Sequence, residues 1–321
     1  MNRFWKNAMA AFLIFATART AYAMEVIPSG RCVGVKLYTS GLVVCDTAQV
    51  TARDGTKRDI AKGYGIEKGD VIIGINGNAA AANDSIKKAL RDDPQSITLT
   101  IERNGREHDV KITPADTEDG PKLGLWLRDS TAGMGTITCY VGDRFAALGH
   151  GICDIDTGNI MPAGHGIIQD ATSFSVIKSK NGEPGAIYGE IDGDVIGRIT
   201  DNKNNGLFGT AEAPEEAKTV ETAKKSEIRC GAATILCDID GGGVKEYGIE
   251  IKRIFATSDG RDMIIRVTDP ALIEKTGGIV QGMSGAPILQ NGRLAGAVTH
   301  VFVNDPLSGY AIFADNLLKD M

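Results

Sequence analysis

From about residue 123 onward the chain consists of short apolar runs separated by polar turns, and this spacing constrains the fold more than any other feature. Runs of this length between turn residues are typical of β-strands. Forty glycines and only 6% aromatic residues agree with tight turns, because glycine accepts positive φ angles. The runs are 135–141, 186–189, 194–199, 234–239, 247–256 and 263–267. The pattern predicts an antiparallel β region long enough for two small barrels.

Two hairpins are predicted from Asn-Gly pairs between strand-like runs. Asn291 and Gly292 separate 288–290 from 293–303, and a second Asn-Gly pair separates 96–103 from 106–112. Asn-Gly is the preferred sequence of a type I′ turn, in which both central residues have positive φ. Ahead of the second hairpin the chain reads as short strands with one helix over 84–90.

The first 23 residues have the features of an export signal. A positive start at Arg3 and Lys6 precedes an apolar run over 8–16 and an Ala-Tyr-Ala site at 21–23. The apolar run is about half of the roughly 20 residues that span a bilayer. We therefore predict a signal peptide over 1–23 and an exported chain, with an uncleaved signal anchor as the alternative.

Charge and cysteine usage exclude several classes of function. The formal net charge is −6 without a Lys/Arg cluster, which argues against a nucleic-acid partner. The six cysteines form no C-x-x-C pair and only four histidines are present, so we predict no metal site and no cofactor. In an exported chain the cysteines could form up to three disulfides of undetermined pairing, or remain buried thiols.

Residues 65–77 carry a second recognisable pattern, GIEKGDVIIGING. The run resembles the core of PDZ domains of the bacterial protease type, and it implies an N-terminal α+β domain that binds a peptide terminus or docks on its own chain. Such domains add the peptide to a sheet edge and hold its carboxylate on backbone N–H groups. The expected carboxylate-binding loop is Thr39, Ser40, Gly41 and Leu42; an ordinary turn without a ligand is the alternative.

A polar segment bracketed by prolines separates the two regions. Its composition is that of a linker. The expected organisation is therefore a signal segment 1–23, a PDZ-like domain 24–113, a linker 114–122 and a β-rich domain 123–321.

The segment 281–287, QGMSGAP, has the Gly-x-Ser-Gly-x-Pro form found around the nucleophile of chymotrypsin-like peptidases. Gly282 lets the backbone turn so that the N–H groups of Gly282 and Ser284 converge on one point, which would form an oxyanion hole. Gly285 removes bulk beside the serine hydroxyl. Taken alone, the motif is also compatible with a turn that has no catalytic role.

A nucleophilic serine needs a base, and His150 is the best candidate among His108, His150, His165 and His300. It ends the apolar segment 145–149 between two glycines, as the histidine of chymotrypsin-like enzymes does. His108 falls in the N-terminal hairpin and His165 in a turn, while His300 is expected to pack on the strand after the Asn291-Gly292 hairpin. Cys153, three residues after His150, is a rival nucleophile, but adjacency in sequence does not supply the facing geometry or the lowered thiol pKa that a Cys-His pair needs.

Five blocks of the chain together resemble the SpoIVB peptidase family, the stage IV sporulation protein B. They are 128–136 (RDSTAGMGT), 147–150 (ALGH), 268–270 (TDP), 275–285 (KTGGIVQGMSG) and 299–306 (THVFVNDP). The resemblance implies a chymotrypsin-like double β-barrel with a catalytic triad of Ser284, His150 and Asp269. Asp269 is also well placed to cap a helix that begins at Pro270. Other carboxylates that folding could bring to His150 are Asp143, Asp154, Asp156 and Asp201.

The expected function is that of an exported serine endopeptidase. By resemblance, it cleaves itself and a membrane-bound regulatory protein in the forespore intermembrane space, which activates a late mother-cell sigma factor. The alternative is an exported PDZ-type peptide-binding scaffold whose second domain is an inactive protease relative. A retained pair of Ser284 and His150 favours the enzyme.

Overall fold

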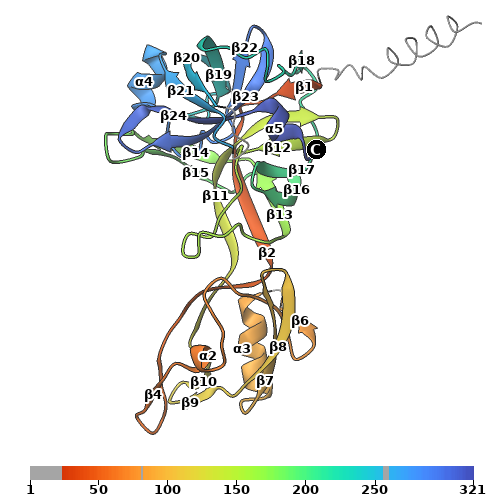
Figure 1. The fold of residues 1–321 in the computed structure, drawn as a ribbon, viewed down its shortest axis with the longest axis vertical. Coiled ribbons are helices and arrows are strands. Elements are labelled where there is room, and N and C mark those ends of the chain that lie inside the picture. Colours follow the sequence, from red (N-terminus) through yellow and green to blue (C-terminus); the bar gives the residue numbers. More distant parts are fainter. Residues whose placement is uncertain (1–23, 81, 256–259) are drawn as a thin grey trace, which may run out of the picture.

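The computed structural model describes residues 24–80, 82–255 and 260–321, and the predicted signal segment 1–23 lies outside them. Within the described residues no helix is long and apolar enough to cross a membrane. The chain forms an upper part made almost wholly of strands and a smaller lower part that contains a helix (Figure 1). Two long strands, β2 and β11, run from one part into the other.

The first barrel is a closed ring of six antiparallel strands. Its order is β2-β11-β12-β17-β16-β13, and the pairing of β13 with β2 closes it. The strands are β2 (Cys32–Thr47), β11 (Leu125–Val141), β12 (Arg144–Ala147), β13 (Ala163–Gln169), β16 (Val195–Lys203) and β17 (Gly206–Ala211). The short strands β1 (Glu25–Pro28) and β18 (Val220–Glu221) extend this sheet beyond β11.

The second barrel is also closed, in the order β19-β20-β21-β24-β23-β22. Its strands are β19 (Gly231–Cys237), β20 (Lys245–Ile254), β21 (Met263–Val267), β22 (Pro287–Gln290), β23 (Arg293–Phe302) and β24 (Asp305–Phe313). Helix α4 (Pro270–Thr276) follows β21, helix α5 (Ala314–Leu318) follows β24, and a separate hairpin is formed by β14 (Thr172–Ile177) and β15 (Ala186–Glu190). The expected mainly-β fold with a double barrel is therefore present.

The lower part is a small α+β body. Its sheet continues from β2 through β5 (Val71–Ile75) to β7 (Ile97–Arg103) and β8 (Arg106–Ile112), with helix α3 (Asn83–Asp92) packed on it. The remaining elements are β3 (Val50–Thr51), β4 (Lys57–Arg58), α2 (Ile60–Gly63), β6 (Asn78–Ala79), β9 (Ala115–Thr117) and β10 (Gly120–Lys122). Whether this body is a PDZ domain stays a prediction.

Both Asn-Gly turns form as predicted. Asn104 and Gly105 have φ of 54° and 71°, and Asn291 and Gly292 have φ of 54° and 75°. Two consecutive positive φ angles define the type I′ turn, whose twist matches the flanking strands. These turns set the registers of the hairpins β7–β8 and β22–β23.

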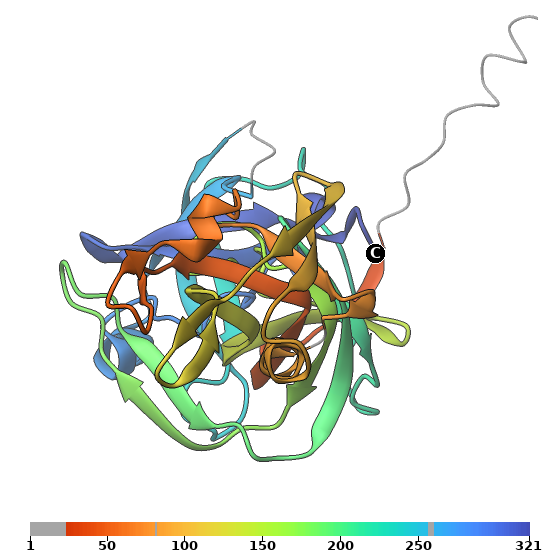
Figure 2. The ribbon, with the colours of Figure 1, turned by 90° about the horizontal axis from the view of Figure 1, so that it is seen from below.

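The strand β2 differs from the expectation of two short stretches around a turn at Ser40. It is one continuous strand of 16 residues, whose first half belongs to the first barrel and whose second half enters the sheet of the lower part (Figures 1 and 2). Strand β1 and the first half of β2 therefore lie in the sheet of the first barrel, and the expected domain boundaries stay a prediction. The expected linker 114–122 is also structured, because it contains the paired strands β9 and β10.

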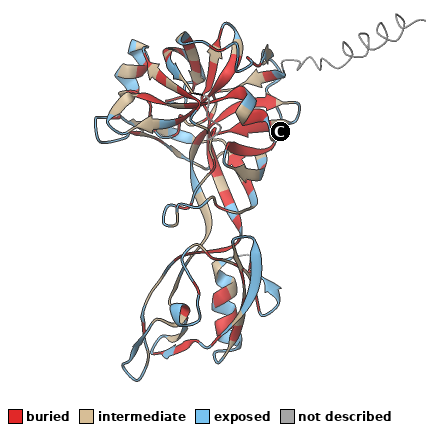
Figure 3. Cartoon of the chain, viewed as in Figure 1, coloured by how far each residue is buried: buried red, intermediate tan, exposed pale blue. Residues whose placement is uncertain are grey.

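Buried side chains concentrate inside the two barrels and on the inner face of α3 (Figure 3). Each barrel has its own apolar core, and a further cluster around Phe208 and Leu317 packs the first barrel against the end of the second. All six cysteines lie within the described residues and none forms a disulfide there. Four of them are buried, as in the alternative of buried thiols, whereas Cys153 and Cys230 are exposed.

Candidate active site

A pocket of about 570 Å³ contains both Ser284 and His150. Its walls come from both barrels: His150 follows β12 of the first, whereas Ser284 precedes β22 of the second. Residues of β11 and of β23 complete the walls. The fold thus brings together two residues that lie 134 positions apart in the chain.

The turn that carries Ser284 is held by strand β11 of the other barrel. Thr136 N–H donates to the carbonyl oxygen of Ser284 at 3.0 Å, and the Thr136 hydroxyl donates to Gly282 O at 2.7 Å. A Cβ atom on Gly285 would lie 2.1 Å from Thr136 O and 2.5 Å from Leu148 N. Only glycine fits where the two barrels approach so closely, which explains the glycine after the serine.

The amides predicted to form an oxyanion hole are free to do so. Among the hydrogen bonds of the described residues, none uses the N–H of Gly282 or the N–H of Ser284, whereas the intervening Met283 N–H donates to Val280 O. Gly282 has a φ of +99°, a conformation that side-chain-bearing residues rarely adopt. Two unpaired amides beside a serine hydroxyl are the groups that stabilise an oxyanion during acyl transfer.

His150 sits on a strained segment. Leu148 and Gly149 both have positive φ, 67° and 70°, and this conformation is costly for a buried leucine. His150 Nδ1 lies 2.9 Å from Gly151 O; because a carbonyl oxygen only accepts, Nδ1 carries the proton. The Nε2 atom of the neutral ring is then an acceptor, as a general base requires.

Burial lowers the pKa of His150, and the hydrogen bond to Gly151 opposes this effect only in part. The ring is therefore neutral at pH 7. Cys153 lines the same pocket, but burial raises the pKa of its thiol, which keeps it in the unreactive protonated form.

The hydroxyl of Ser284 does not point at His150 in this structure. Its Oγ donates to the carbonyl oxygen of Thr299 at 2.7 Å, and no hydrogen bond joins Ser284 to His150 among the described residues. The pair shares the pocket, yet the hydroxyl must rotate before His150 can take its proton.

Asp269 lies elsewhere and caps helix α4. One carboxylate oxygen accepts from Ala271 N and Leu272 N, and the other accepts from Gly248 N at 3.3 Å. Pro270 occupies the first turn, as in the helix-cap alternative. Asp269 does not line the pocket and makes no hydrogen bond to His150 among the described residues. The expected contact between Asp269 and His150 is therefore not formed here.

The other four carboxylates also stay away from His150. Asp143 and Asp201 do not line the pocket, and Asp201 pairs with Lys203. Asp154 and Asp156 lie on the loop that follows His150, where both bind the guanidinium of Arg128. Burial alone raises the pKa of Asp154, but hydrogen bonds from Thr157 and the charge of Arg128 bring it below its ordinary value.

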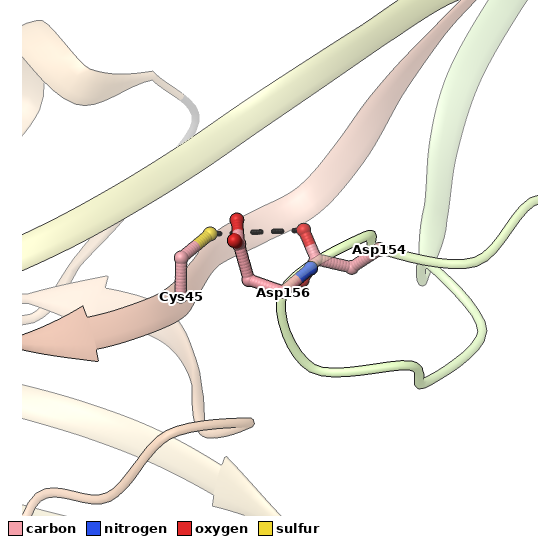
Figure 4. A group of neighbouring side chains, drawn as sticks. All are labelled: Cys45, Asp154 and Asp156. Atoms are coloured by element: carbon pink, nitrogen blue, oxygen red, sulfur yellow. Dashed lines mark hydrogen bonds between the residues drawn. The ribbon is translucent and has the colours of Figure 1, made fainter.

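Cys45, Asp154 and Asp156 form a compact group whose ligand-type atoms lie within 4.8 Å of one another (Figure 4). The thiol of Cys45 on β2 donates to Asp154 on the loop. Burial, followed by the charge of Asp154, raises the pKa of Cys45 to about 11, so this sulfur is a protonated thiol. Because Arg128 already supplies a cation to both carboxylates, the group serves as an ion-paired link between the strands and the loop.

His300 is a pocket residue that the sequence analysis assigned to packing. Its ring lies 4.7 Å from the ring of His150, at an interplanar angle of 33°. Burial, with contributions from His150 and Arg261, lowers the pKa of His300 to about 4. The hairpin offered a partial signal: the Asn291-Gly292 turn pairs Gln290 with Arg293, which extrapolates to His300 opposite Met283, the neighbour of Ser284.

The expected carboxylate-binding loop is not a loop. Thr39, Ser40, Gly41 and Leu42 lie inside strand β2, where Thr39 and Leu42 are buried and Leu42 pairs with Ile72. Thr39 also pairs with Ala163 of β13, and Ser40 N–H donates to Pro162 O, whereas the register between β2 and β11 shifts across 39–42. The Ser-Gly pair therefore lies at an irregularity within β2 and not in a free turn, and its role in peptide binding stays a prediction.

A family model described as SpoIVB peptidase S55 matches residues 119–318. The chain belongs to this family. The matched residues include His150 and Ser284.

A curated relative and several solved structures share parts of this SpoIVB peptidase. The zinc metalloprotease RasP of Geobacillus kaustophilus is 36% identical over 72 residues, which cover 22% of this chain and 17% of that protein. The inactive form of the Rv3671c protease covers 59% of this chain and 81% of that one, at 14% identity and a TM-score of 0.34. The match to the HtrA-type protease AlgW with a decapeptide covers 64% of this chain and 56% of that one, at 14% identity and a TM-score of 0.36.

Proposed function

We propose that this SpoIVB peptidase is a serine endopeptidase in which Ser284 is the nucleophile and His150 the general base. The observation that carries the proposal is the common pocket at the junction of the barrels, which holds both side chains beside two unpaired amides. The neutral His150 ring with Nδ1 bound to Gly151 O leaves Nε2 ready to accept a proton.

The reaction follows from these groups. Ser284 Oγ attacks the peptide carbonyl carbon while His150 Nε2 takes its proton, and the amides of Gly282 and Ser284 hold the oxyanion. The intermediate collapses as His150 gives the proton to the leaving amine. Water, deprotonated by His150, then attacks the acyl ester, which releases the new carboxyl terminus and restores Ser284.

The bond from Ser284 Oγ to Thr299 O represents a resting state of this site. Rotation of the serine side chain about its Cα–Cβ bond breaks the hydrogen bond to Thr299 and turns Oγ toward His150. Only the rotated hydroxyl reacts, so the proposed mechanism requires this orientation in the complex with the substrate. The triad role of Asp269 stays a prediction, since the Gly151 carbonyl supports His150 here.

The biological setting is part of the same proposal. Membership in the SpoIVB family and the signal-like N-terminus support an exported enzyme that acts in the forespore intermembrane space, cleaves itself and cleaves a membrane-bound regulator. In this setting the cleavage would activate a late mother-cell sigma factor, and the N-terminal body would act as a PDZ domain that binds a peptide.

A fluorophosphonate probe tests the mechanism directly, because it reacts with activated serines. The purified chain is treated alongside Ser284→Ala and His150→Ala, and both labelling and self-cleavage are followed by intact mass. The serine endopeptidase is supported if only the unaltered chain is labelled and shortened, and both variants are not. Equal behaviour of all three chains favours the peptide-binding scaffold instead, in which the bond from Ser284 to Thr299 is permanent.

A further inference from the structure

The β14–β15 hairpin, residues 172–190, lies against the segment that leads to Ser284. Gln281 N–H donates to Gly185 O, and Gln281 O accepts from Ile187 N–H, both at 2.8 Å. These two hydrogen bonds form a parallel β-bridge between β15 and the residues just before the nucleophile. Strands β16 to β21 separate the two partners along the chain, so this contact exists only in the folded protein.

The bond from Ile187 fixes the direction of one of the two amides proposed to hold the oxyanion. Gln281 O and Gly282 N–H belong to the same peptide unit, which is planar and trans, so its carbonyl and its N–H point in opposite directions. Because Ile187 N–H holds Gln281 O on the hairpin side, Gly282 N–H is turned away from the hairpin. Gly282 lines the pocket of the proposed active site, and no hydrogen bond of the described residues uses its N–H.

The second amide, that of Ser284, is fixed by its own turn. Its peptide unit contains Met283 O, which accepts from Ala286 N–H at 2.9 Å. The unit of Gly282 has no such local support, because among the described residues only the N–H of Ile187 binds its carbonyl oxygen. One donor of the oxyanion hole is therefore local, whereas the other depends on the hairpin.

Gly282 would allow its peptide unit to reverse if the bond to the hairpin were lost. Its φ is +99°, and glycine adopts positive and negative φ with similar ease. Reversal would turn Gln281 O toward the pocket, where its partial negative charge would repel an oxyanion. Reversal would also leave the N–H of Ile187, a residue that is only 3% exposed, without an acceptor. A buried N–H without a partner is costly, so the attached hairpin favours the observed orientation.

Ser179 attaches the hairpin to the same segment at further points. Its hydroxyl donates to Ile279 O and accepts from Gly185 N–H, each at 2.8 Å, and the residue is only 5% exposed. The N–H of Ser179 donates to Thr276 O at 2.8 Å. Ile279 and Gly185 lie on the two segments that the β-bridge joins. Loss of this hydroxyl would therefore loosen both sides of the bridge.

The two faces of the hairpin have different surroundings. Phe174 and Val176 are partly buried and pack on the core of the second barrel, to which Ile187 also belongs. Ser175 and Ile177, which alternate with them along β14, are exposed. The inner face is therefore the one that acts on the nucleophile segment, and the outer face supplies a control position.

We propose that the β14–β15 hairpin holds the oxyanion hole in its active form, with Ser179 as the positioning residue. With the hairpin attached, Ile187 N–H binds Gln281 O and the amide of Gly282 is available to the oxyanion. With the hairpin detached, this peptide unit is free to reverse and one of the two donors is lost. This inference rests on the proposed function of Ser284.

Separate values of kcat and KM for Ser179→Ala test the positioning role. The oxyanion forms only as the reaction proceeds, so a displaced donor lowers kcat and leaves substrate binding nearly unchanged. Complete removal of one donor costs about 10²–10³-fold in kcat. We expect Ser179→Ala to lower kcat by about 30-fold or more and to keep KM within about twofold. A folded Ser179→Ala protein with normal kcat would overturn the proposal, and so would one that changes KM alone.

Two further variants separate the hydroxyl from general damage to the fold. Ser179→Thr keeps a hydroxyl at this position and should restore most of the kcat that Ser179→Ala loses. Ser175→Ala removes a hydroxyl from the exposed face of β14 and should leave kcat unchanged. Thermal melting verifies that all three variants are folded. If Ser175→Ala lowers kcat as much as Ser179→Ala does, or if folded Ser179→Thr restores nothing, Ser179 is not the positioning residue.

Hydrogen exchange measures the attachment of the hairpin without any activity. The exchange of backbone amides is followed by mass spectrometry in Ser284→Ala, with and without Ser179→Ala. The amides of Ile187 and Gln281 should exchange at least about tenfold faster when the Ser179 hydroxyl is absent, because the bridge opens more often. The amides of β24, in the same barrel, should be unaffected.

The two measurements separate this inference from the proposed function. Faster exchange in Ser179→Ala, combined with no cleavage by the unaltered chain, would keep the attachment of the hairpin to the Gly282 peptide unit and reject the serine endopeptidase. Cleavage with unchanged kcat and unchanged exchange in Ser179→Ala would keep the endopeptidase and reject the role of the hairpin. A lower kcat without faster exchange would mean that Ser179 acts by another route, which also rejects that role.

Discussion

The hydroxyl of Ser284 donates its hydrogen bond to the carbonyl oxygen of Thr299, 2.7 Å away, while His150 stands in the same pocket. The barrels thus bring the proposed nucleophile and its proposed base into one pocket but leave the hydroxyl turned toward Thr299. In the proposed mechanism, activity depends on a single side-chain rotation, and this dependence makes the roles of the surrounding residues testable.

Ser284→Ala and His150→Ala should each reduce kcat/KM by about 10⁴-fold or more, because acyl transfer loses its nucleophile or its base. Peptide cleavage measures the effect. His165→Ala is the matched control, since His165 lies on β13 and stacks on Tyr38 outside the pocket, and it should leave the rate unchanged. A His150→Ala enzyme with normal activity would remove His150 from the mechanism.

The acid limb of the kcat/KM profile should lie below the ordinary histidine pKa of about 6.5. Burial lowers the pKa of His150, so the ring loses its proton, and gains its function as a base, at a lower pH than a free imidazole would. A profile measured from pH 4 to 9 checks this. An acid limb above pH 7 would contradict the burial argument.

His300 should make the fold less stable at acid pH. Its pKa is lowered to about 4, so the unfolded chain binds a proton before the folded chain does. The contribution of neutral His300 to the free energy of unfolding is complete above about pH 6.5 and is lost as the pH falls toward 4. Urea unfolding from pH 7 to 4 should show a smaller loss for His300→Asn than for the unaltered chain. If the free energy of unfolding falls equally with pH in both proteins, other groups cause the loss of stability.

Asp269→Asn separates the helix cap from the triad acid. Asparagine caps helices as well as aspartate does, so stability should be kept, whereas Asp269→Ala should lose about 1 kcal/mol. We expect Asp269→Asn to retain kcat/KM within about threefold, since the carboxylate is bound to α4 and Gly248. If a folded Asp269→Asn protein has a kcat/KM lower by about 10³-fold or more, Asp269 belongs to the triad in an active conformation.

Arg128→Met should destabilise the chain by about 3 kcal/mol, because it leaves the buried carboxylate of Asp154 without its cation. Asp156→Asn is the control: Asp156 is 46% exposed, and its loss should cost less than about 1 kcal/mol. Urea unfolding gives both values. Equal effects would mean that the Arg128 link to the loop after His150 contributes no more than a surface ion pair.

The sequence by itself determined much of the local structure. The Asn-Gly pairs specified two hairpins because type I′ turns favour those residues, and the apolar runs specified the antiparallel strands of the barrels. The glycines around Ser284 also specified the nucleophile turn, since the close approach of Thr136 and Leu148 at Gly285 admits no side chain. Each of these features depends on neighbours in the chain or on backbone conformation alone.

Only the tertiary structure decided which residues meet across the chain. It incorporated Thr39 to Leu42 into strand β2, left Asp269 without a hydrogen bond to His150 and placed the ring of His300 against that of His150. These outcomes depend on strand register and barrel closure, which are set by the sum of long-range contacts and so leave no local signal at the residues concerned.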